Sequence, residues 1–299
     1  MNRQNSLDER LSNLFPELFS IARPITTSDV PVIVAASMLS IYDSPILPII
    51  REGTAPAGKE NNEAKLFQAI GSLPIVRMVL EIQPSEYYKA LWQPCTTRSI
   101  WIGSLGFQDT LEDLLRIYEA TGFGDARVEA PTPPNTLITL SEVVSLFGLR
   151  KLRCSAEVNK VASRIVQVDP DALLLDALRS MSENRIRRLF LRGRQGEFIS
   201  DRSVLGYLLS PKALKIVRDA PESWLDVKVS AIQSVKADVI SANAKVEDVG
   251  SMVSPGRDVF VLSDGFHLLS KWDLVMKPWK MGLLNLAPAL RHKESSSSA

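Results

Sequence analysis

The same order of hydrophobic and polar patterns returns four times along the chain. The clearest copy lies at 161–209, where an apolar strand at 164–168 leads through Asp169-Pro170-Asp171 into a helix. Apolar residues then recur at three- and four-residue intervals, which places them on one buried face of a helix: Leu173, Leu174, Ala177, Leu178 and Met181. Strands at 189–191 and 198–199 and a helix from Asp201 follow. The pattern predicts a strand-helix-strand-strand-helix unit.

The other copies have the same order. Repeats are expected at about 20–82, 95–150, 155–212 and 225–278, so that the halves 1–150 and 151–299 each hold two. The residue that follows the third strand is Gly71, Thr139, Ser200 or Ser270, and these positions are about 60 to 70 residues apart. A polar insert at 51–65 reads as a loop, and a turn is expected at 131–134. Beyond the last repeat we expect a packing arm at 277–290 and a disordered tail at 291–299.

Two short segments resemble the CBS domain, the family named for cystathionine beta-synthase. Arg185-Ile186-Arg187-Arg188-Leu189 is similar to the family's basic and apolar approach to the second strand, and Ser270-Lys271-Trp272-Asp273 is similar to its Ser/Thr-x-x-Asp ligand motif. The resemblance implies an α/β (α+β) fold of four CBS repeats in two Bateman modules. This arrangement is similar to that of the gamma subunits of AMP-activated protein kinase. It also implies an adenine nucleotide, namely AMP, ADP or ATP, as a regulatory ligand.

The chemistry of the Ser-x-x-Asp motif supports such a ligand. The hydroxyl of Ser270 stands beside free backbone N–H groups at a helix start, which suits phosphate oxygens. The Asp273 carboxylate lies one turn further on and can accept hydrogen bonds from the hydroxyls of a ribose. The same residues also form an ordinary capping box, and both interpretations stay open.

The equivalent positions in the other repeats are unequal. Thr139 and Glu142 keep a hydroxyl and an acid, although the longer Glu favours capping over ligand binding. Ser200 is followed by Ser203 instead of an acid, and the first repeat has neither group at Gly71 and Pro74. Degraded motifs of this kind leave room for clefts that bind no ligand.

The family resemblance extends the ligand site to the neighbouring repeat. It implies that Ile165, Val166 and Val168 close the pocket of Ser270 and Asp273. It further implies that Ile186 and Arg187 flank the base or the phosphates and that Arg257 enters from the second strand of its own repeat. The alternative for the basic residues at 185–188 is a solvated edge that pairs with nearby acids.

Composition narrows the location and the kinds of partner. The net charge of +1 gives no electrostatic footprint for nucleic acid or an anionic membrane. Met1 to Arg10 lacks a signal-peptide core and no run of eighteen apolar residues occurs, so we expect a cytoplasmic protein. Cys95 and Cys154 are expected to be reduced thiols without a metal.

These observations predict a regulatory sensor and not an enzyme. His267 and His292 are the only histidines, and no phosphate-binding Gly-Lys loop or nucleophile elbow occurs. We expect that an adenine nucleotide alters the packing of the two modules, and with it a surface for a protein partner in energy sensing. The alternative is an interaction scaffold with vestigial clefts. The two modules form a disc within one chain, or two chains stack as a homodimer.

Overall fold

The structure is a computed structural model that describes residues 7–17, 24–42, 46–50, 66–129 and 136–287. The insert predicted at 51–65, the turn at 131–134 and the tail at 291–299 lie outside the described residues. Within the described residues, helices and strands alternate in the predicted order. No described helix has both the length and the apolar character that a membrane crossing requires.

Each repeat contributes two main helices and a few strands. The first has β1 (Thr26–Thr27), α2 (Val32–Ile41), β2 (Ile46–Ile50), β3 (Leu66–Gly71) and α3 (Ser72–Glu81). The second has β4 (Ile100–Gly106), α5 (Leu111–Thr121), β5 (Asp125–Glu129), β6 (Thr136–Thr139) and α6 (Leu140–Gly148). The third has β9 (Gln167–Val168), α7 (Leu174–Glu183), β10 (Arg188–Leu191), β11 (Glu197–Ser200) and α8 (Asp201–Leu208). The fourth has β13 (Asp238–Ile240), α10 (Val246–Met252), β14 (Val259–Leu262), β15 (His267–Ser270) and α11 (Lys271–Lys280).

Shorter elements connect the repeats. They are α1 (Leu11–Leu14), α4 (Tyr87–Leu91), α9 (Pro211–Asp219), β7 (Leu152–Arg153), β8 (Ser163–Arg164), β12 (Val235–Lys236) and β16 (Asn285–Leu286). Single 3-10 turns lie at Pro84–Glu86, Cys95–Arg98, Val158–Lys160, Pro221–Ser223 and Val229–Ala231. In the expected C-terminal arm, α11 runs on to Lys280 and β16 then pairs with β7.

The strands that enter the repeats cross between neighbours. The single strand predicted at 164–168 is divided: β8 pairs with β15 of the fourth repeat, and β9 pairs with β10 of the third. In return, β12 on the way to the fourth repeat pairs with β11 of the third. In the first half, β4 pairs with both β3 and β5, so the described strands form one six-stranded sheet and not two separate sheets. The repeats of each half are therefore interlocked by backbone hydrogen bonds.

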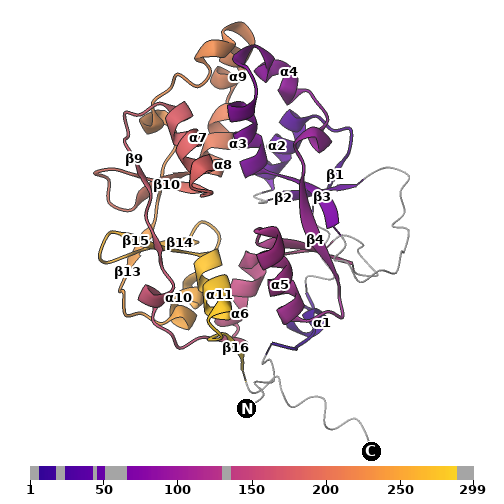
Figure 1. Ribbon diagram of the computed structural model, residues 1–299, viewed down its shortest axis with the longest axis vertical. Helices are drawn as coiled ribbons and strands as arrows, with labels where there is room; N and C mark the ends of the chain where they lie inside the picture. The colour runs from indigo at the N-terminus through magenta and orange to yellow at the C-terminus, as the bar shows by residue number, and fades with distance from the viewer. Residues whose placement is uncertain (1–6, 18–23, 43–45, 51–65, 130–135, 288–299) are drawn as a thin grey trace, which may run out of the picture.

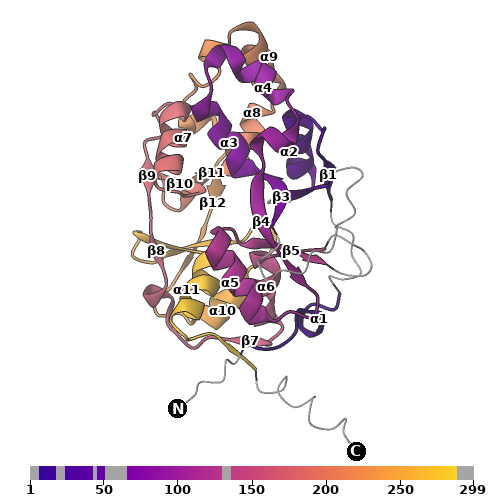
Figure 2. The ribbon, with the colours of Figure 1, turned by 45° about the vertical axis from the view of Figure 1, so that its right-hand side comes forward.

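The helices of the two halves face each other across the centre of the molecule (Figure 1). Helix α3 packs against α7 and α8, and α6 packs against α10 and α11. In Figure 2 the helices of the first and third repeats, α3 and α8, lie above those of the second and fourth, α5, α6 and α11. One large core joins the first and third repeats and another joins the second and fourth, so each draws on both halves of the chain.

Two short helices outside the repeats cap the end of the molecule that holds the first and third repeats (Figure 1). Helix α4 packs against α9 there, and the ring of Tyr87 lies 5.0 Å from that of Trp224. The Tyr87 hydroxyl donates to the carbonyl of Val79 at 2.9 Å. Aromatic residues thus fix the segments that lead from one repeat to the next.

Candidate functional site

The residue that ends the third strand of each repeat caps the following helix. Gly71, Thr139, Ser200 and Ser270 are the N-cap residues of α3, α6, α8 and α11. The antiparallel register places Ile46, Asp125, Arg188 and Val259 opposite these caps. The register therefore defines equivalent positions in the four repeats, whichever residues occupy them.

Asp273 is enclosed by groups of its own chain. One carboxylate oxygen accepts from the backbone N–H of Ser270 at 2.9 Å and from its hydroxyl at 2.7 Å. The other oxygen accepts from the Ser163 hydroxyl at 2.6 Å and lies 2.9 Å from Nζ of Lys277. The Asp273 side chain is 3% exposed. The capping box is present, and both oxygens have partners.

The residues that the resemblance implies as the lining of this pocket lie in two different apolar clusters. Ser163 in β8, and not the segment 165–168, contacts Asp273. Ile165 packs against the apolar cluster between the sheets of the third and fourth repeats. Val168 is buried in the core that joins the first and third repeats, and Val166 and Ile186 pack against that core. The assignment of these residues to one ligand pocket stays a prediction.

The caps of α6 and α8 also use their own side chains. The hydroxyl of Thr139 accepts from the backbone N–H of Ser141 at 3.1 Å, and Glu142 accepts from the backbone N–H of Thr139 at 2.8 Å. The Ser200 hydroxyl accepts from the backbone N–H of Ser203 at 3.1 Å. At both helix starts the predicted residues cap the helix, as the alternative interpretation expects.

Arg187 joins the third repeat to the first at the centre of the molecule. Its Nε donates to Asp201, whose side chain is 3% exposed, at 2.8 Å. Ser72 at the start of α3 donates to the same carboxylate oxygen at 2.5 Å, and Nη2 of Arg187 reaches the Ser72 hydroxyl at 3.3 Å. The carboxylate of Asp201 raises the pKa of Arg187 and keeps it charged. This triangle anchors α3 to α8 through a charge-assisted bond.

The fourth repeat carries the opposite charges at the same two positions. Asp258 precedes β14 as Arg187 precedes β10, and Lys271 begins α11 as Asp201 begins α8. Nζ of Lys271 lies 3.3 Å from Asp258, and it also donates to Ser141 of the second repeat at 2.8 Å. Lys271 thus joins the fourth repeat to the second.

The second repeat fills the equivalent positions with Gly124 and Leu140. The backbone N–H of Leu140 donates to the Gly124 carbonyl at 2.8 Å, as that of Asp201 donates to the Arg187 carbonyl at 3.0 Å. A Cβ on Gly124 would lie 2.2 Å from the Leu140 side chain, so a larger residue there would require that side chain to move. The same pair of positions therefore holds an apolar contact in the second repeat, an ion pair in the third and an ion pair of reversed sign in the fourth.

Asp125 is a buried carboxylate among these charges. It is 5% exposed at the start of β5. Burial raises its pKa to about 6, an effect that Arg187 and Lys271 oppose and Glu142 reinforces. The centre of the molecule thus combines acids and bases from three repeats in a partly desolvated setting.

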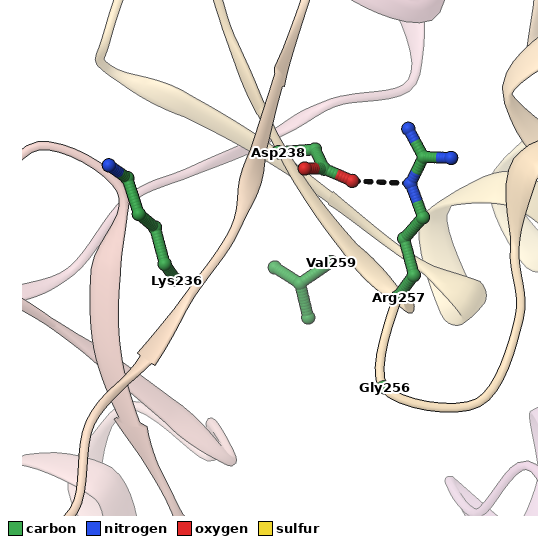
Figure 3. Close-up of a pocket in the computed structure, with 5 residues that line it drawn as sticks. All are labelled: Lys236, Asp238, Gly256, Arg257 and Val259. Carbon is green, nitrogen blue, oxygen red and sulfur yellow. Dashed lines mark hydrogen bonds and ion pairs between the residues drawn. The ribbon is translucent and has the colours of Figure 1, made fainter.

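An open pocket of about 360 Å³ lies beside the strands of the fourth repeat. Figure 3 shows its lining residues, namely Lys236, Asp238, Gly256, Arg257 and Val259. Arg257 is the one predicted site residue among them, and its guanidinium pairs with Asp238. Lys236 comes from β12, which belongs to the sheet of the third repeat. The pocket therefore has two cations in its lining, and Figure 3 shows their charged ends on opposite sides of it.

Sequence reasoning did not single out Ser163, Lys277, Asp125, Asp201 or Lys236. Lys277 follows Asp273 by four residues, a spacing that places both on one face of a helix, so its contact was detectable. Asp201 and Lys271 directly follow the cap residues Ser200 and Ser270, so aligning the repeats at these caps would have shown opposite charges at one position. No sequence pattern indicated Ser163 or Lys236. Ser163 reaches Asp273, and Lys236 reaches the pocket of Arg257, only because β8 and β12 pair with strands of the neighbouring repeat.

Comparisons with known proteins identify the fold. The sequence matches no family model and no curated protein. Among solved structures, a Methanocaldococcus jannaschii protein proposed to be an archaeal homologue of g-AMPK matches with a TM-score of 0.70 and 16% identity. The match covers 91% of this chain and 100% of that chain.

Two further structures illustrate the range of the matches. A conserved protein from Pyrococcus horikoshii has a TM-score of 0.48 at 14% identity, covering 86% of this chain and 96% of that one. CBSX2, solved in complex with AMP, has a TM-score of 0.32 at 16% identity, covering 42% of this chain and 98% of that one. The match to the Methanocaldococcus jannaschii protein establishes the fold of the chain.

Proposed function

We propose that this chain, whose fold is that of four tandem CBS repeats, is a regulatory protein that binds an adenine nucleotide and signals its occupancy to a protein partner. The observation that carries the proposal is the pocket at the junction of the third and fourth repeats. Arg257 offers a planar fork of donors that suits a phosphate group, and Lys236 adds a second positive charge to the lining of the pocket. Its volume of about 360 Å³ falls within the range of small-molecule sites.

The location of the pocket connects binding with a change of shape. Lys236 and Asp238 lie on either side of the crossing from the sheet of the third repeat into that of the fourth. A phosphate that draws Arg257 away from Asp238 removes the carboxylate's partner at the start of β13. Binding energy is thereby available to shift one repeat against the other, and a partner surface that spans both repeats would register the shift.

Thermal unfolding in the presence of AMP, ADP and ATP tests this proposal. A bound nucleotide at a hundredfold excess over its dissociation constant stabilises the folded state by about 2.7 kcal/mol. Replacing Arg257 or Lys236 with Gln should weaken the affinity about tenfold, since a charged donor is lost. Arg194→Gln is a matched control, because Arg194 has the same side-chain exposure of 45% as Arg257 and lies outside the pocket. Unchanged melting temperatures with all three nucleotides would refute the proposal.

A scaffold without a nucleotide is the second candidate, and the enclosure of Asp273 favours it. Its carboxylate is bonded by Ser163, Ser270 and Lys277, which leaves no free oxygen for a ribose. Tyr88 on α4 and Trp92 at the C-cap of α4, 43% and 53% exposed, offer aromatic surface to a protein partner. A purified partner complex whose affinity is unchanged by nucleotide and by Arg257→Gln would support this candidate over the first.

A further inference from the structure

Helix α2 carries apolar residues on two opposite faces. One face lies in the core that joins the first and third repeats, through Val32, Ala35, Ala36 and Leu39. On the other side Val34, Ile41 and Tyr42 are 43%, 76% and 58% exposed, and the partly buried Met38 lies among them. At 3.6 residues per turn these side chains share a sector of about 100°, turned away from the core. We call Val34, Met38, Ile41 and Tyr42 the outer stripe.

Helix α7 shows that the fold does not require apolar residues at these positions. Both α2 and α7 are the first main helix of their repeat, have ten residues, and bury the first, fourth, fifth and eighth of them. At the positions equivalent to the outer stripe, α7 has Asp176, Ser180, Glu183 and Asn184. Polar residues are normal on the solvent side of such a helix. The outer stripe is therefore specific to the first repeat, and an exposed apolar patch of this kind marks an interaction surface.

The outer stripe can be covered without any change in the packing of the repeats. Helix α2 already contacts α3, α4 and α8 through its other sides. Figure 2 shows α2 at the margin of the molecule, on the side away from α7. A protein that binds there leaves the two cores intact. The surface also lies in the first repeat, whereas the pocket of Arg257 lies beside the fourth.

The charge of this region favours a second copy of the chain as the partner. No charged residue occurs from Val30 to Tyr42. Interfaces between different proteins commonly use charged groups to select and orient the partner, and α2 offers none. Two copies that meet along α2 bring no like charges together there, and the net charge of +1 opposes their approach only weakly.

The spacing of the outer stripe is also self-complementary. Val34, Met38 and Ile41 follow one another at intervals of four and three residues, the spacing of the seam between two paired helices. In an antiparallel pair around a two-fold axis near Met38, each Val34 meets the Ile41 of the other copy. The outer stripe exposes on the order of 400 Å² per copy, which is typical of a weak, reversible interface.

We propose that the outer stripe is a self-association surface, through which two copies of the chain pair reversibly by antiparallel packing of their α2 helices. Each chain keeps its own four repeats, so this dimer differs from one in which two chains stack to complete a disc. The contact uses neither the Arg257 pocket nor a nucleotide, and it is therefore independent of the proposed function.

Sedimentation velocity of the full chain at rising protein concentration tests the proposal. The wild type should shift from monomer to dimer. Val34→Glu and Ile41→Lys should each raise the dimer dissociation constant at least about tenfold, because a charge is then buried against an apolar residue. Both positions are exposed in the monomer, and Glu and Lys favour a helix more than Val and Ile do, so the fold should be retained.

A mixture of the two variants tests the antiparallel arrangement. Mixing Val34→Glu with Ile41→Lys should restore association, because the introduced carboxylate of one chain faces the introduced ammonium of the other. At the second contact of this mixed dimer, the native Ile41 and Val34 still meet. Added salt should weaken the mixed dimer and leave the wild-type dimer unaffected. A parallel pair would bring position 34 to position 34, and the mixture would then gain nothing.

Three results would overturn the proposal. They are a wild type that stays monomeric at every concentration, undiminished association of both single variants, and a mixture that associates no better than its components. Leu149→Lys is the control, because Leu149 is 61% exposed at the C-cap of α6 and its substitution should leave association unchanged. If Val34→Glu fails to fold, Ile41→Gln tests the same contact at the most exposed position of the stripe and should also weaken association.

Discussion

Lys277 and Asp273 form an ion pair within α11, with Nζ 2.9 Å from Oδ1 and the acid almost wholly buried. The same ammonium group donates to the Ser163 hydroxyl at 2.9 Å and to the Ala162 carbonyl at 3.1 Å. Lys277 therefore ties the last helix of the chain to the strand that enters the third repeat. The carboxylate that the resemblance assigns to a ribose is paired with a lysine of its own helix.

Lys277→Met should destabilise the fold by about 1 to 3 kcal/mol, because Asp273 loses the charge that compensates its burial. This figure is below that of a fully buried pair, since the Lys277 side chain is 35% exposed. Urea unfolding measures the difference. Lys280→Met, in the same helix but in an exposed pair with Glu119, is the control and should change stability by about 0.5 kcal/mol or less.

The Lys277→Met variant also separates the two interpretations of Asp273. If Asp273 accepts the ribose hydroxyls of a nucleotide, the variant should bind AMP more tightly than the wild type, because the lysine no longer competes for the carboxylate. Isothermal titration calorimetry of both proteins gives the comparison. An altered stability with an unchanged AMP affinity would mean that Asp273 serves only as a cap.

Asp125→Asn should stabilise the protein above neutral pH. The folded state raises the pKa of Asp125 from 3.8 to about 6, so it binds a proton that the unfolded state has released. The resulting stability is complete below about pH 4 and is lost as the pH rises through 6, a change of about 3 kcal/mol. The wild type and Asp125→Asn should therefore have similar stabilities at pH 4 and should diverge by pH 7.5. Parallel curves of unfolding free energy against pH would contradict the assignment.

A double-mutant cycle on Ser72 and Arg187 should show coupling between the first and third repeats. Arg187→Gln leaves the buried carboxylate of Asp201 with Ser72 as its remaining partner and should cost about 3 kcal/mol. Ser72→Ala should cost about 1 kcal/mol. Because both side chains bond to one oxygen, the coupling energy should exceed about 0.5 kcal/mol. Additive effects would show that the triangle does not act as a unit.

Two helical glycines should respond to alanine with opposite signs. A Cβ on Gly250 of α10 would lie 2.5 Å from the Phe147 ring of α6, so Gly250→Ala should destabilise by about 1 to 3 kcal/mol through overpacking. A Cβ on Gly206 of α8 meets nothing within 4 Å, so Gly206→Ala should stabilise by about 0.5 to 1 kcal/mol. Thermal unfolding of both variants compares the two effects. Destabilisation by Gly206→Ala would contradict the open space around it.

The hydrophobic pattern predicted the repeats because each element has clear local boundaries. The strands predicted at 189–191 and 198–199 lie within β10 and β11, and the helix predicted from Asp201 begins at that residue, since turn-forming residues separate the two apolar runs. The pattern could not divide 164–168 between two sheets, because the choice of a partner strand depends on tertiary contacts. It also could not show that Asp273 finds all its partners within the chain, because Ser163 is remote in sequence.

The reversed ion pairs at the centre have a consequence for assembly. In a disc built from two identical chains, symmetry places every residue twice. Arg187 and Asp258 would then each occur at two equivalent positions with the same surroundings. Here one chain supplies all the described repeats, and each position at the junction carries its own residue. A substitution at one pair of these positions therefore leaves the equivalent pair in the other repeat unchanged.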